Sequence, residues 1–319
     1  MEIKSVALLG AGAVGSYIIW GLSKLPDIRF GIIAEGSRAA RLRDEGCTIN
    51  NVTYHPQVWS PQESKGVDLL IIALKYGALP GALASIREAV GTHTTVMSLM
   101  NGVDSEEIIA GVVDSKQILP ALIKIASHHD GNGVRFNPEK TIGIVFGEAQ
   151  APFDSERVLA IEALMHSADI HIRHTDCINE EIWCKFRLNV CNNLPQAILG
   201  AGVGCYQSSA HMKAISDGLC HELEAIAVAK GIDLSKVDAS SRHGSLVPPA
   251  TRYSTLQDLD AGRHTEIDMF SGALMRMGQE LGIPTPYNEY TYHMIKALEE
   301  KNDGLFDYAA KASNLTCAK

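Results

Sequence analysis

The sequence predicts an α/β protein, with a doubly wound parallel sheet in its first half and an all-helical second half. Apolar runs alternate with helical segments up to about residue 150, and the first run leads directly into a glycine-rich turn. From residue 155 onward, helical periodicity replaces β-type alternation. Continuous apolar strands separated by helices are typical of a parallel sheet that helices cover on both faces. At 319 residues the chain exceeds a typical single core, so we expect two domains, 1–172 and 173–319.

Apolar runs and their spacing predict the individual elements. Strands are expected at 5–9, 29–34, 69–74, 95–99, 118–125 and 141–146, with a last strand at 169–172. Helices are expected in the intervals, for example at 37–45 and 79–90. The runs 134–136 and 142–146 flank turn residues and predict a hairpin at the sheet edge. The second half predicts helices at 178–193, 211–230 and 265–281.

The glycine-rich turn follows the first strand and consists of Gly10, Ala11, Gly12, Ala13, Val14 and Gly15. In a dinucleotide-binding Rossmann turn, the first glycine permits a tight turn and the second lets the backbone approach a pyrophosphate. The third glycine allows close helix packing, and the helix N-terminus offers free N–H groups to the anion. A bare G-x-G-x-x-G is weak evidence, and an ordinary glycine turn is the alternative. The position between strand and helix favours a phosphate cradle.

Two residue types at the end of the second strand bear on the choice of cofactor. Glu35 is the acidic residue expected to bind the ribose 2′-hydroxyl of NAD. Arg38 and Arg41 open the next helix and could accommodate the 2′-phosphate of NADP, or be ordinary solvated charges. Residue types alone leave this choice open.

Polar residues also follow the third and fourth strands. Lys75 comes after the apolar run 69–74, and Asn101-Gly102 comes after the run 96–99. Ligands of doubly wound sheets bind just outside the carboxyl ends of the strands. Lys75 could instead be a surface lysine, and Asn-Gly is a common turn. Because the two polar residues follow successive strands, each strengthens the interpretation of the other as a ligand contact.

A polar row crosses an otherwise apolar helix in the second half. Lys185, Asn189 and Asn193 recur every four residues, which places them on one helix face. Such a row is costly unless it faces solvent, has partners or lines a cavity. Ser254 and Glu266 are further candidates, although residues 254–258 also fit a helix-capping box. We expect Glu266 in the first turn of the helix 265–281, where an acid complements the helix dipole.

Composition excludes several classes of protein. The net charge of −9 and a sequence pI near 5.7 leave no basic stripe for nucleic acid. We expect no membrane span and no secretory signal. The seven cysteines form no C-x-x-C pair, which favours a reducing, cytoplasmic setting. His128-His129 and His171 with His174 lack a third ligand at a convincing spacing, so we expect no metal.

Together these residues resemble the ketopantoate reductase family (2-dehydropantoate 2-reductase), nearly from end to end. The resemblance rests on five segments. They are the glycine turn with its flanks (8–16), Leu74-Lys75, Met100-Asn101-Gly102, Trp183-Cys184-Lys185-Phe186 with Asn189 and Asn193, and residues 254–258 leading to 264–268. The last two are far more specific than the glycine turn. The family's fold, a Rossmann domain followed by a helical domain, agrees with the change of character along this chain.

The resemblance implies a role for each matching residue. Lys185 would donate the proton to the substrate carbonyl, and Glu266 would contact both the cofactor and Lys185. Asn189, Asn193 and Ser254 would hold the carboxylate and hydroxyl of the substrate. Asn101 would bridge the nicotinamide ribose and the substrate. The glycine turn, Arg38 and Lys75 would contact NADPH.

The implied activity is NADPH-dependent reduction of ketopantoate to D-pantoate, on the route to pantothenate. Three departures keep alternatives open. Leu194 separates Asn193 from Pro195, residues 200–204 lack an expected asparagine, and Glu35 stands where a basic residue is common. The first two favour another 2-keto acid as the alternative substrate. A non-catalytic NADP-binding sensor is a third hypothesis. The partner is a small 2-keto acid, and the apolar helical half is compatible with a homodimer.

Overall fold

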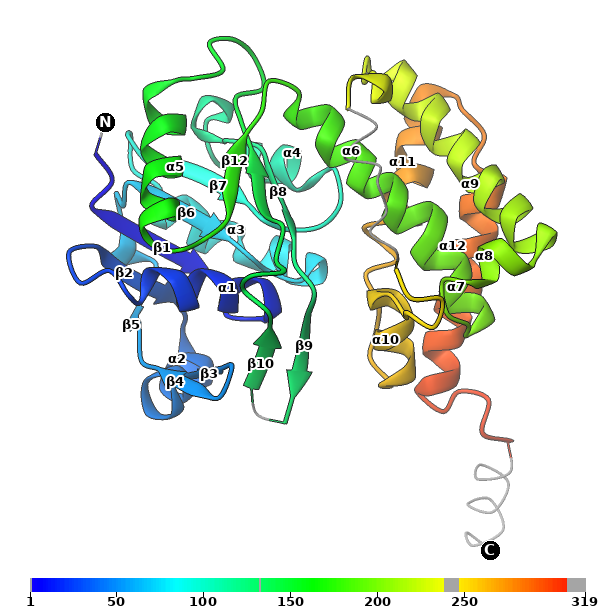
Figure 1. The fold of residues 1–319 in the computed structure, drawn as a ribbon, viewed down its shortest axis with the longest axis horizontal. Coiled ribbons are helices and arrows are strands. Elements are labelled where there is room, and N and C mark those ends of the chain that lie inside the picture. The colour runs from blue at the N-terminus through cyan, green and yellow to red at the C-terminus, as the bar shows by residue number, and fades with distance from the viewer. Residues whose placement is uncertain (1, 132, 238–246, 309–319) are drawn as a thin grey trace, which may run out of the picture. The chain divides into compact units, whose positions relative to one another are not determined.

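The computed structural model describes residues 2–131, 133–237 and 247–308. The chain divides into two compact units, Met1–Ile182 and Trp183–Lys319 (Figure 1). The division falls inside helix α6 (Ile178–Leu188), which follows the last strand of the first unit. A domain boundary at 172 stays a prediction.

The first unit is built on a sheet of five parallel strands in the order β5-β2-β1-β6-β7. These strands are β1 (Ser5–Leu9), β2 (Arg29–Ile33), β5 (Gln57–Trp59), β6 (Leu69–Ile72) and β7 (Thr95–Ser98). After β1, the strands β2 and β5 are added on one side of it, and β6 and β7 are then added on its other side. The strand order therefore reverses at β1. In doubly wound sheets ligands bind at the carboxyl ends of the strands beside such a reversal.

Alternate side chains of β1 enter two different cores. Val6 and Leu8 pack in one cluster with helices α1 (Ala13–Leu22), α2 (Gly36–Glu45) and α5 (Glu156–Ser167). Ala7 and Leu9 pack in the other with α3 (Leu79–Ala89) and α4 (Ser105–Ala110). Successive strand residues point to opposite faces, so helices cover the sheet on both sides. The doubly wound parallel sheet is confirmed.

Two smaller sheets complete the first unit and correct the predicted topology. The strands β8 (Ala121–Lys124) and β11 (Gly143–Phe146) pair antiparallel, and β11 pairs parallel with β12 (Ile172–His174). The run 118–125 therefore meets the parallel sheet only through one parallel bridge, between Ile118 and Val96 of β7, and the run 141–146 does not extend that sheet. Only a hairpin, not a crossover helix, lies between them in the chain, and a parallel connection needs a crossover.

The predicted hairpin between 134–136 and 142–146 is wrong. β10 (Gly133–Phe136) instead pairs with the preceding strand β9 (Ser127–Asp130), through the turn at Gly131. β10 also pairs with β3 (Cys47–Ile49), and β3 pairs with β4 (Val52–Tyr54). Short 3-10 turns occur at η1 (Gln62–Ser64), η2 (Tyr76–Ala78) and η3 (Ser115–Gln117).

The second unit is helical in its described residues, as predicted (Figure 1). Its later elements are α7 (Leu194–Leu199), α8 (Cys205–Ser208), α9 (Ala210–Ala229), η5 (Leu234–Lys236), α10 (Ser254–Asp260), α11 (Ser271–Leu281) and α12 (Pro286–Asn302). Helix α9 contacts α7, α11 and α12. The side chain of Ser209 caps it by accepting a hydrogen bond from the Met212 amide. α9 begins one residue earlier than the predicted helix 211–230 and ends one residue earlier.

Two predicted helices differ from the structure. The helix expected at 178–193 is α-helical only to Leu188, and Asn189–Asn193 form a π-helical turn, η4. The helix expected at 265–281 begins at Ser271. None of the described helices combines the length and hydropathy that a bilayer span requires. The six described cysteines are free thiols, and Cys317 lies outside the described residues.

Candidate active site

The three glycines of the turn after β1 differ in their steric surroundings. Gly10 has a φ of +112°, and a Cβ there would lie 2.3 Å from the carbonyl oxygen of Ala73. A Cβ on Gly15 would lie 2.0 Å from the carbonyl oxygen of Gly10. Gly12 has no atom within 4 Å of its Cβ position. The fold itself therefore requires the outer two glycines, whereas Gly12 leaves open space beside the backbone.

Gly12 is also the N-cap residue of α1. No side chain caps this helix, and its first turn contains no acidic residue. The leading N–H groups of a helix carry a partial positive charge and favour an anion. Open space at Gly12 together with uncapped N–H groups fits the pyrophosphate of a dinucleotide.

The predicted cofactor residues follow four neighbouring strands at the same edge of the sheet. In the register, Leu9 of β1 pairs with Ile33 of β2 and with Ile72 of β6, and Ile72 pairs with Ser98 of β7. One predicted cofactor residue follows each of these strand ends by one to three positions. In the order β1, β2, β6 and β7, they are Gly10, Glu35, Lys75 and Asn101. The parallel sheet thus brings together what the sequence spreads over more than 90 residues.

The loops after β6 and β7 are tied together by a side-chain contact. The hydroxyl of Tyr76 donates a hydrogen bond to Oδ2 of Asp104, 2.7 Å away. Lys75, just before Tyr76, is exposed, and Asn101 is half-buried. This contact links the two loops that carry Lys75 and Asn101.

Glu35 and Arg38 stay close in the structure, on the N-terminal end of α2. Glu35 is the N-cap residue, and its side chain makes no capping hydrogen bond. Arg38 lies in the first turn, and both side chains are exposed. Either residue can therefore face a bound ribose, so the geometry leaves the choice between them open.

In the second unit, the polar row spans two kinds of helix. Lys185 lies on α6, whereas Asn189 and Asn193 bound the π-helical turn η4. Nδ2 of Asn193 donates a hydrogen bond to Oδ1 of Asn189 at 3.1 Å. Asn193 is buried, and Lys185 and Asn189 are half-buried. π turns within α-helices occur frequently at functional sites.

Ser254 is the first residue of α10, and its side chain is exposed. Tyr253 is the N-cap residue, and no side chain makes a capping hydrogen bond there. The capping-box alternative for 254–258 is therefore wrong. Helix α10 packs against η4 and α7. Ser254 thus begins a helix that contacts the turn carrying Asn189 and Asn193.

Glu266 lies in the turn that precedes α11, not in the first turn of the helix. The backbone N–H groups of Met269 and Phe270 donate to the carbonyl oxygen of Glu266 at 3.0 and 3.2 Å. The ring of Phe270 packs on that of Phe186 with 6.3 Å between the ring centroids. Phe186 follows Lys185 in α6, so this contact joins the segment that carries Lys185 to the turn that carries Glu266.

A buried carboxylate holds the residue before Glu266. The backbone N–H and the hydroxyl of Thr265 both donate to Oε1 of Glu299, at 2.7 and 2.6 Å. Glu299 is only 2% exposed. Its other oxygen lies 3.3 Å from Nζ of Lys296 and 3.6 Å from Nδ1 of His264. The hydrogen bonds from Thr265 and Lys296 satisfy the buried carboxylate and fix the start of the turn.

Helix α12 also holds the residue two positions after Glu266. Asp268 accepts hydrogen bonds from the Tyr292 hydroxyl and from Nζ of Lys296, both at 2.8 Å. Partial burial opposes ionisation of Asp268, but these hydrogen bonds outweigh it and lower its pKa. Burial likewise opposes the charge on Lys296, and the hydrogen bond to Asp268 and the charge of Glu299 raise its pKa nonetheless. Glu266 therefore lies between two anchored neighbours.

Sequence reasoning missed the residues on α12 that anchor this turn. Tyr292, Lys296 and Glu299 stand four and three positions apart, which places them along one helix face. A carboxylate, an ammonium and a phenol in one row on a helix with buried neighbours could have indicated that this face binds another polar segment. Their partner segment could not be found this way, because it lies about 30 residues earlier in the chain.

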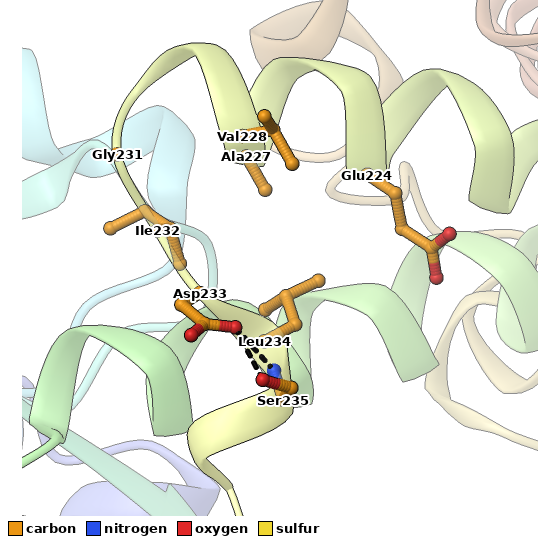
Figure 2. A pocket seen from close by; sticks show the side chains of 8 residues that line it. All are labelled: Glu224, Ala227, Val228, Gly231, Ile232, Asp233, Leu234 and Ser235. Atoms are coloured by element: carbon orange, nitrogen blue, oxygen red, sulfur yellow. Dashed lines mark hydrogen bonds between the residues drawn. The ribbon is translucent and has the colours of Figure 1, made fainter.

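Two surface hollows of the second unit are lined by other residues. One, of about 470 Å³, is formed by the C-terminal end of α9 and the turn that follows it (Figure 2). There Asp233 accepts hydrogen bonds from the amide and hydroxyl of Ser235. Another, of about 490 Å³, lies between α11 and α12. Neither is lined by a predicted site residue, and no metal-binding cluster of three or more ligands occurs among the described residues.

Comparison with known proteins assigns the chain to a family. The family model described as ketopantoate reductase PanE/ApbA matches residues 6–150, and the model of its C-terminal part matches residues 177–299. The chain belongs to the ketopantoate reductase family. The resemblance read from the glycine turn, the lysine–asparagine row and the segment around Glu266 is thereby confirmed, and the chain is an oxidoreductase.

Curated relatives match nearly the whole chain at low identity. A 2-dehydropantoate 2-reductase of Streptococcus pyogenes is 24% identical over 302 residues, covering 92% of this chain and 97% of the relative. A 2-dehydropantoate 2-reductase of Archaeoglobus fulgidus is 24% identical over 308 residues, covering 94% and 99%. Both relatives therefore align with nearly the full length of this chain.

Solved structures share the fold. A PanE/ApbA family ketopantoate reductase from Ralstonia eutropha superposes with a TM-score of 0.78 at 24% identity, covering 94% of this chain and 99% of that one. A D-mandelate dehydrogenase solved with NADH superposes with a TM-score of 0.79 at 22% identity and the same coverage. Because proteins named for different substrates share this ketopantoate reductase fold, the fold alone does not select the substrate.

Proposed function

We propose that the chain reduces ketopantoate to D-pantoate with NADPH. The observation that carries this proposal is the row of Lys185, Asn189 and Asn193 in a chain of the ketopantoate reductase family, with the two amides joined through a π turn. A cation and a pair of oriented amides are what a 2-keto acid needs. The names of the curated relatives support the same reaction.

The cofactor would be held by the residues at the strand ends of the first unit. The turn at Gly10–Gly15 would receive the pyrophosphate, Arg38 the 2′-phosphate, and Lys75 and Asn101 the remaining polar groups. When bound, NADPH supplies the hydride for the ketone carbon. The open space at Gly12 supports this placement.

The remaining chemistry falls to side chains of this chain. Negative charge grows on the ketone oxygen as the carbonyl is reduced. The ammonium of Lys185 would stabilise that charge and deliver the proton, and Glu266 would hold the ammonium in place. Asn189, Asn193 and Ser254 would bind the carboxylate and hydroxyl of the substrate, and Asn101 would contact substrate and cofactor.

The alternative is the same chemistry on another 2-keto acid. It is supported by residues 200–204, where an asparagine expected from the family resemblance is absent. A non-catalytic NADP-binding sensor is less well supported, because a sensor needs the glycine turn but not the lysine and amide row.

A substrate panel tests the proposal. The purified protein is mixed with NADPH and with ketopantoate or other branched and hydroxylated 2-keto acids, and NADPH oxidation is followed. We expect ketopantoate to give the highest kcat/KM. A higher kcat/KM for another keto acid would make that acid the substrate in place of ketopantoate. Tight NADPH binding without turnover on any keto acid would support the hypothesis of a non-catalytic sensor. Repeating the series with NADH tests the cofactor.

A further inference from the structure

A tyrosine hydroxyl lies within the helical hydrogen-bond ladder beside the candidate substrate amides. The hydroxyl of Tyr206 accepts a hydrogen bond from the backbone N–H of Gln196 at 3.1 Å. The same hydroxyl donates to the backbone carbonyl of Asn192. In an α-helix these two backbone groups, four residues apart, bond to each other directly. Tyr206 therefore acts as an added member of the ladder between them.

This insertion occurs where the helix departs from α geometry. The π turn η4 ends at Asn193, one residue after the carbonyl that Tyr206 contacts. Pro195 has no N–H, so the carbonyl of Cys191 lacks its usual donor. A side chain entering the ladder and a proline are both known causes of distorted helices. Burial raises the pKa of Tyr206, so the hydroxyl keeps the proton that it donates.

Gln196 extends this contact to the segment that enters α10. Its side chain is fully buried. Nε2 donates to the carbonyl of Thr251 at 2.8 Å, and Oε1 accepts from the backbone N–H of Tyr253 at 2.8 Å. Ser254 is the next residue. One buried amide thus ties the helix that follows Asn193 to the backbone that leads into Ser254.

The glycine-rich segment 200–204 brings Tyr206 into place. A Cβ on Gly202 would lie 2.3 Å from the carbonyl oxygen of Pro249, and one on Gly204 would lie 2.7 Å from Cβ of Pro249. The N–H of Val203 donates to the carbonyl of Thr251 at 2.9 Å. The segment runs so close to residues 249–251 that side chains at these two glycines would not fit. The segment 200–204, which lacks the expected asparagine, thus serves to position Tyr206.

We infer that Tyr206 and Gln196 are positioning residues for the substrate: Tyr206 holds open the helical turn that aims Asn193, and Gln196 fixes that turn to the backbone entering Ser254. The inference rests on the proposed function, since it assigns these residues to the site where Asn193 and Ser254 bind the keto acid. Neither residue touches the reacting atoms.

Tyr206→Phe, which keeps the ring and removes the hydroxyl, tests the inference. We expect KM for the keto acid to rise about tenfold or more, because small misplacement of binding groups is costly. The Kd for NADPH should stay unchanged. The matched control is Tyr17→Phe, which removes a buried hydroxyl that accepts from the His171 N–H at 2.8 Å in the first unit. It should leave KM for the keto acid unchanged.

Crystal structures of the wild type and Tyr206→Phe provide a second readout. We expect residues 189–193 of the variant to return to α geometry, with Gln196 N–H bonded directly to the Asn192 carbonyl. Either an unchanged KM or an unchanged π turn overturns the inference. Should Tyr206→Phe not fold, Gln196→Met provides the kinetic test, with the same expected rise in KM. A wild type without turnover on any keto acid overturns the proposed function and the substrate role with it, whereas an active wild type with unaffected variants overturns the inference alone.

Discussion

Nδ2 of Asn193 donates a hydrogen bond to Oδ1 of Asn189, 3.1 Å away, across a π-helical turn. The bond uses the acceptor of Asn189 and one donor of Asn193. It leaves both amide donors of Asn189, together with the second amide donor and the acceptor of Asn193, for a ligand. A carboxylate needs donors, and a hydroxyl can use either. The pair is therefore suited to hold both polar groups of a hydroxylated keto acid.

Substitutions at Asn189 distinguish a ligand role from a structural one. Asn189→Asp keeps the acceptor for Asn193 but places a negative charge where the substrate carboxylate would bind. Asn189→Ala loses the bond without adding charge. We expect Asn189→Asp to raise KM for the keto acid at least about tenfold more than Asn189→Ala does, because like charges repel. Steady-state kinetics measures this, and equal KM values would exclude carboxylate binding at Asn189.

Lys185 carries the proposed proton transfer. Lys185→Ala should lower kcat by about 10²- to 10⁴-fold, the usual contribution of a general acid, with the Kd for NADPH retained. Lys213→Ala is the control, because Lys213 is an exposed lysine of α9 paired with Asp217. Its kcat should equal that of the wild type. Turnover by Lys185→Ala equal to that of the wild type would remove Lys185 from the reaction.

Gly12 offers a test of cofactor binding that does not disturb the fold. Gly12→Ala meets no atom within 4 Å, so the melting temperature should not fall. The added methyl would occupy the space where the pyrophosphate approaches, and Kd for NADPH should rise about tenfold or more. Gly81→Ala in α3 also meets no atom and should leave Kd unchanged. NADPH titration of both variants decides the matter.

Arg38 is the residue proposed to select NADPH. Arg38→Ala should raise KM for NADPH about tenfold and leave KM for NADH unchanged, because a charge-assisted contact to the 2′-phosphate is lost. Arg87→Ala, which removes an exposed arginine of α3, is the control. A wild type that binds NADH as tightly as NADPH would instead assign the adenosine ribose to Glu35.

Two buried glutamates of the second unit permit a matched comparison. Glu299 holds Thr265 beside Glu266, whereas Glu222 holds the backbone N–H groups of Tyr287 and Asn288 at the start of α12. Changing either to Gln should lower stability by about 1.5–3 kcal/mol, the value of a hydrogen bond to a charged group. Only Glu299→Gln should also lower kcat, since only that turn carries Glu266. A normal kcat for Glu299→Gln, measured with its melting temperature, would contradict this role.

The sequence predicts the positions of residues correctly where one geometric rule applies to many of them. The edge that holds Gly10, Glu35, Lys75 and Asn101 could be predicted, because the ends of parallel strands meet at one edge whatever the loops between them do. The strands β3, β4 and β5 could not, because three residues are too few to show a period.

Features that depend on contacts between residues far apart in the sequence could not be predicted from it. The spacing of Ile267, Phe270 and Leu274 fits a helix as well as it fits a buried turn followed by one, so the start of α11 at Ser271 was missed. The hydroxyl of Tyr206 reaches back 14 residues to Asn192, and Gln196 reaches forward 57 residues to Tyr253. Neither contact leaves a local pattern.

The π turn also alters how this stretch of chain can be compared with other helices. A π turn closes its hydrogen bonds over five residues where an α turn uses four, so it contains one residue more. One extra residue rotates everything after it by about 100° around the axis. A helical wheel drawn through 178–199 as a single helix would therefore place every residue after the turn about 100° from its position in the structure. The segments before and after the turn have separate phases, and a single-residue deletion within 189–193 would be expected to merge them while turning Asn193 away.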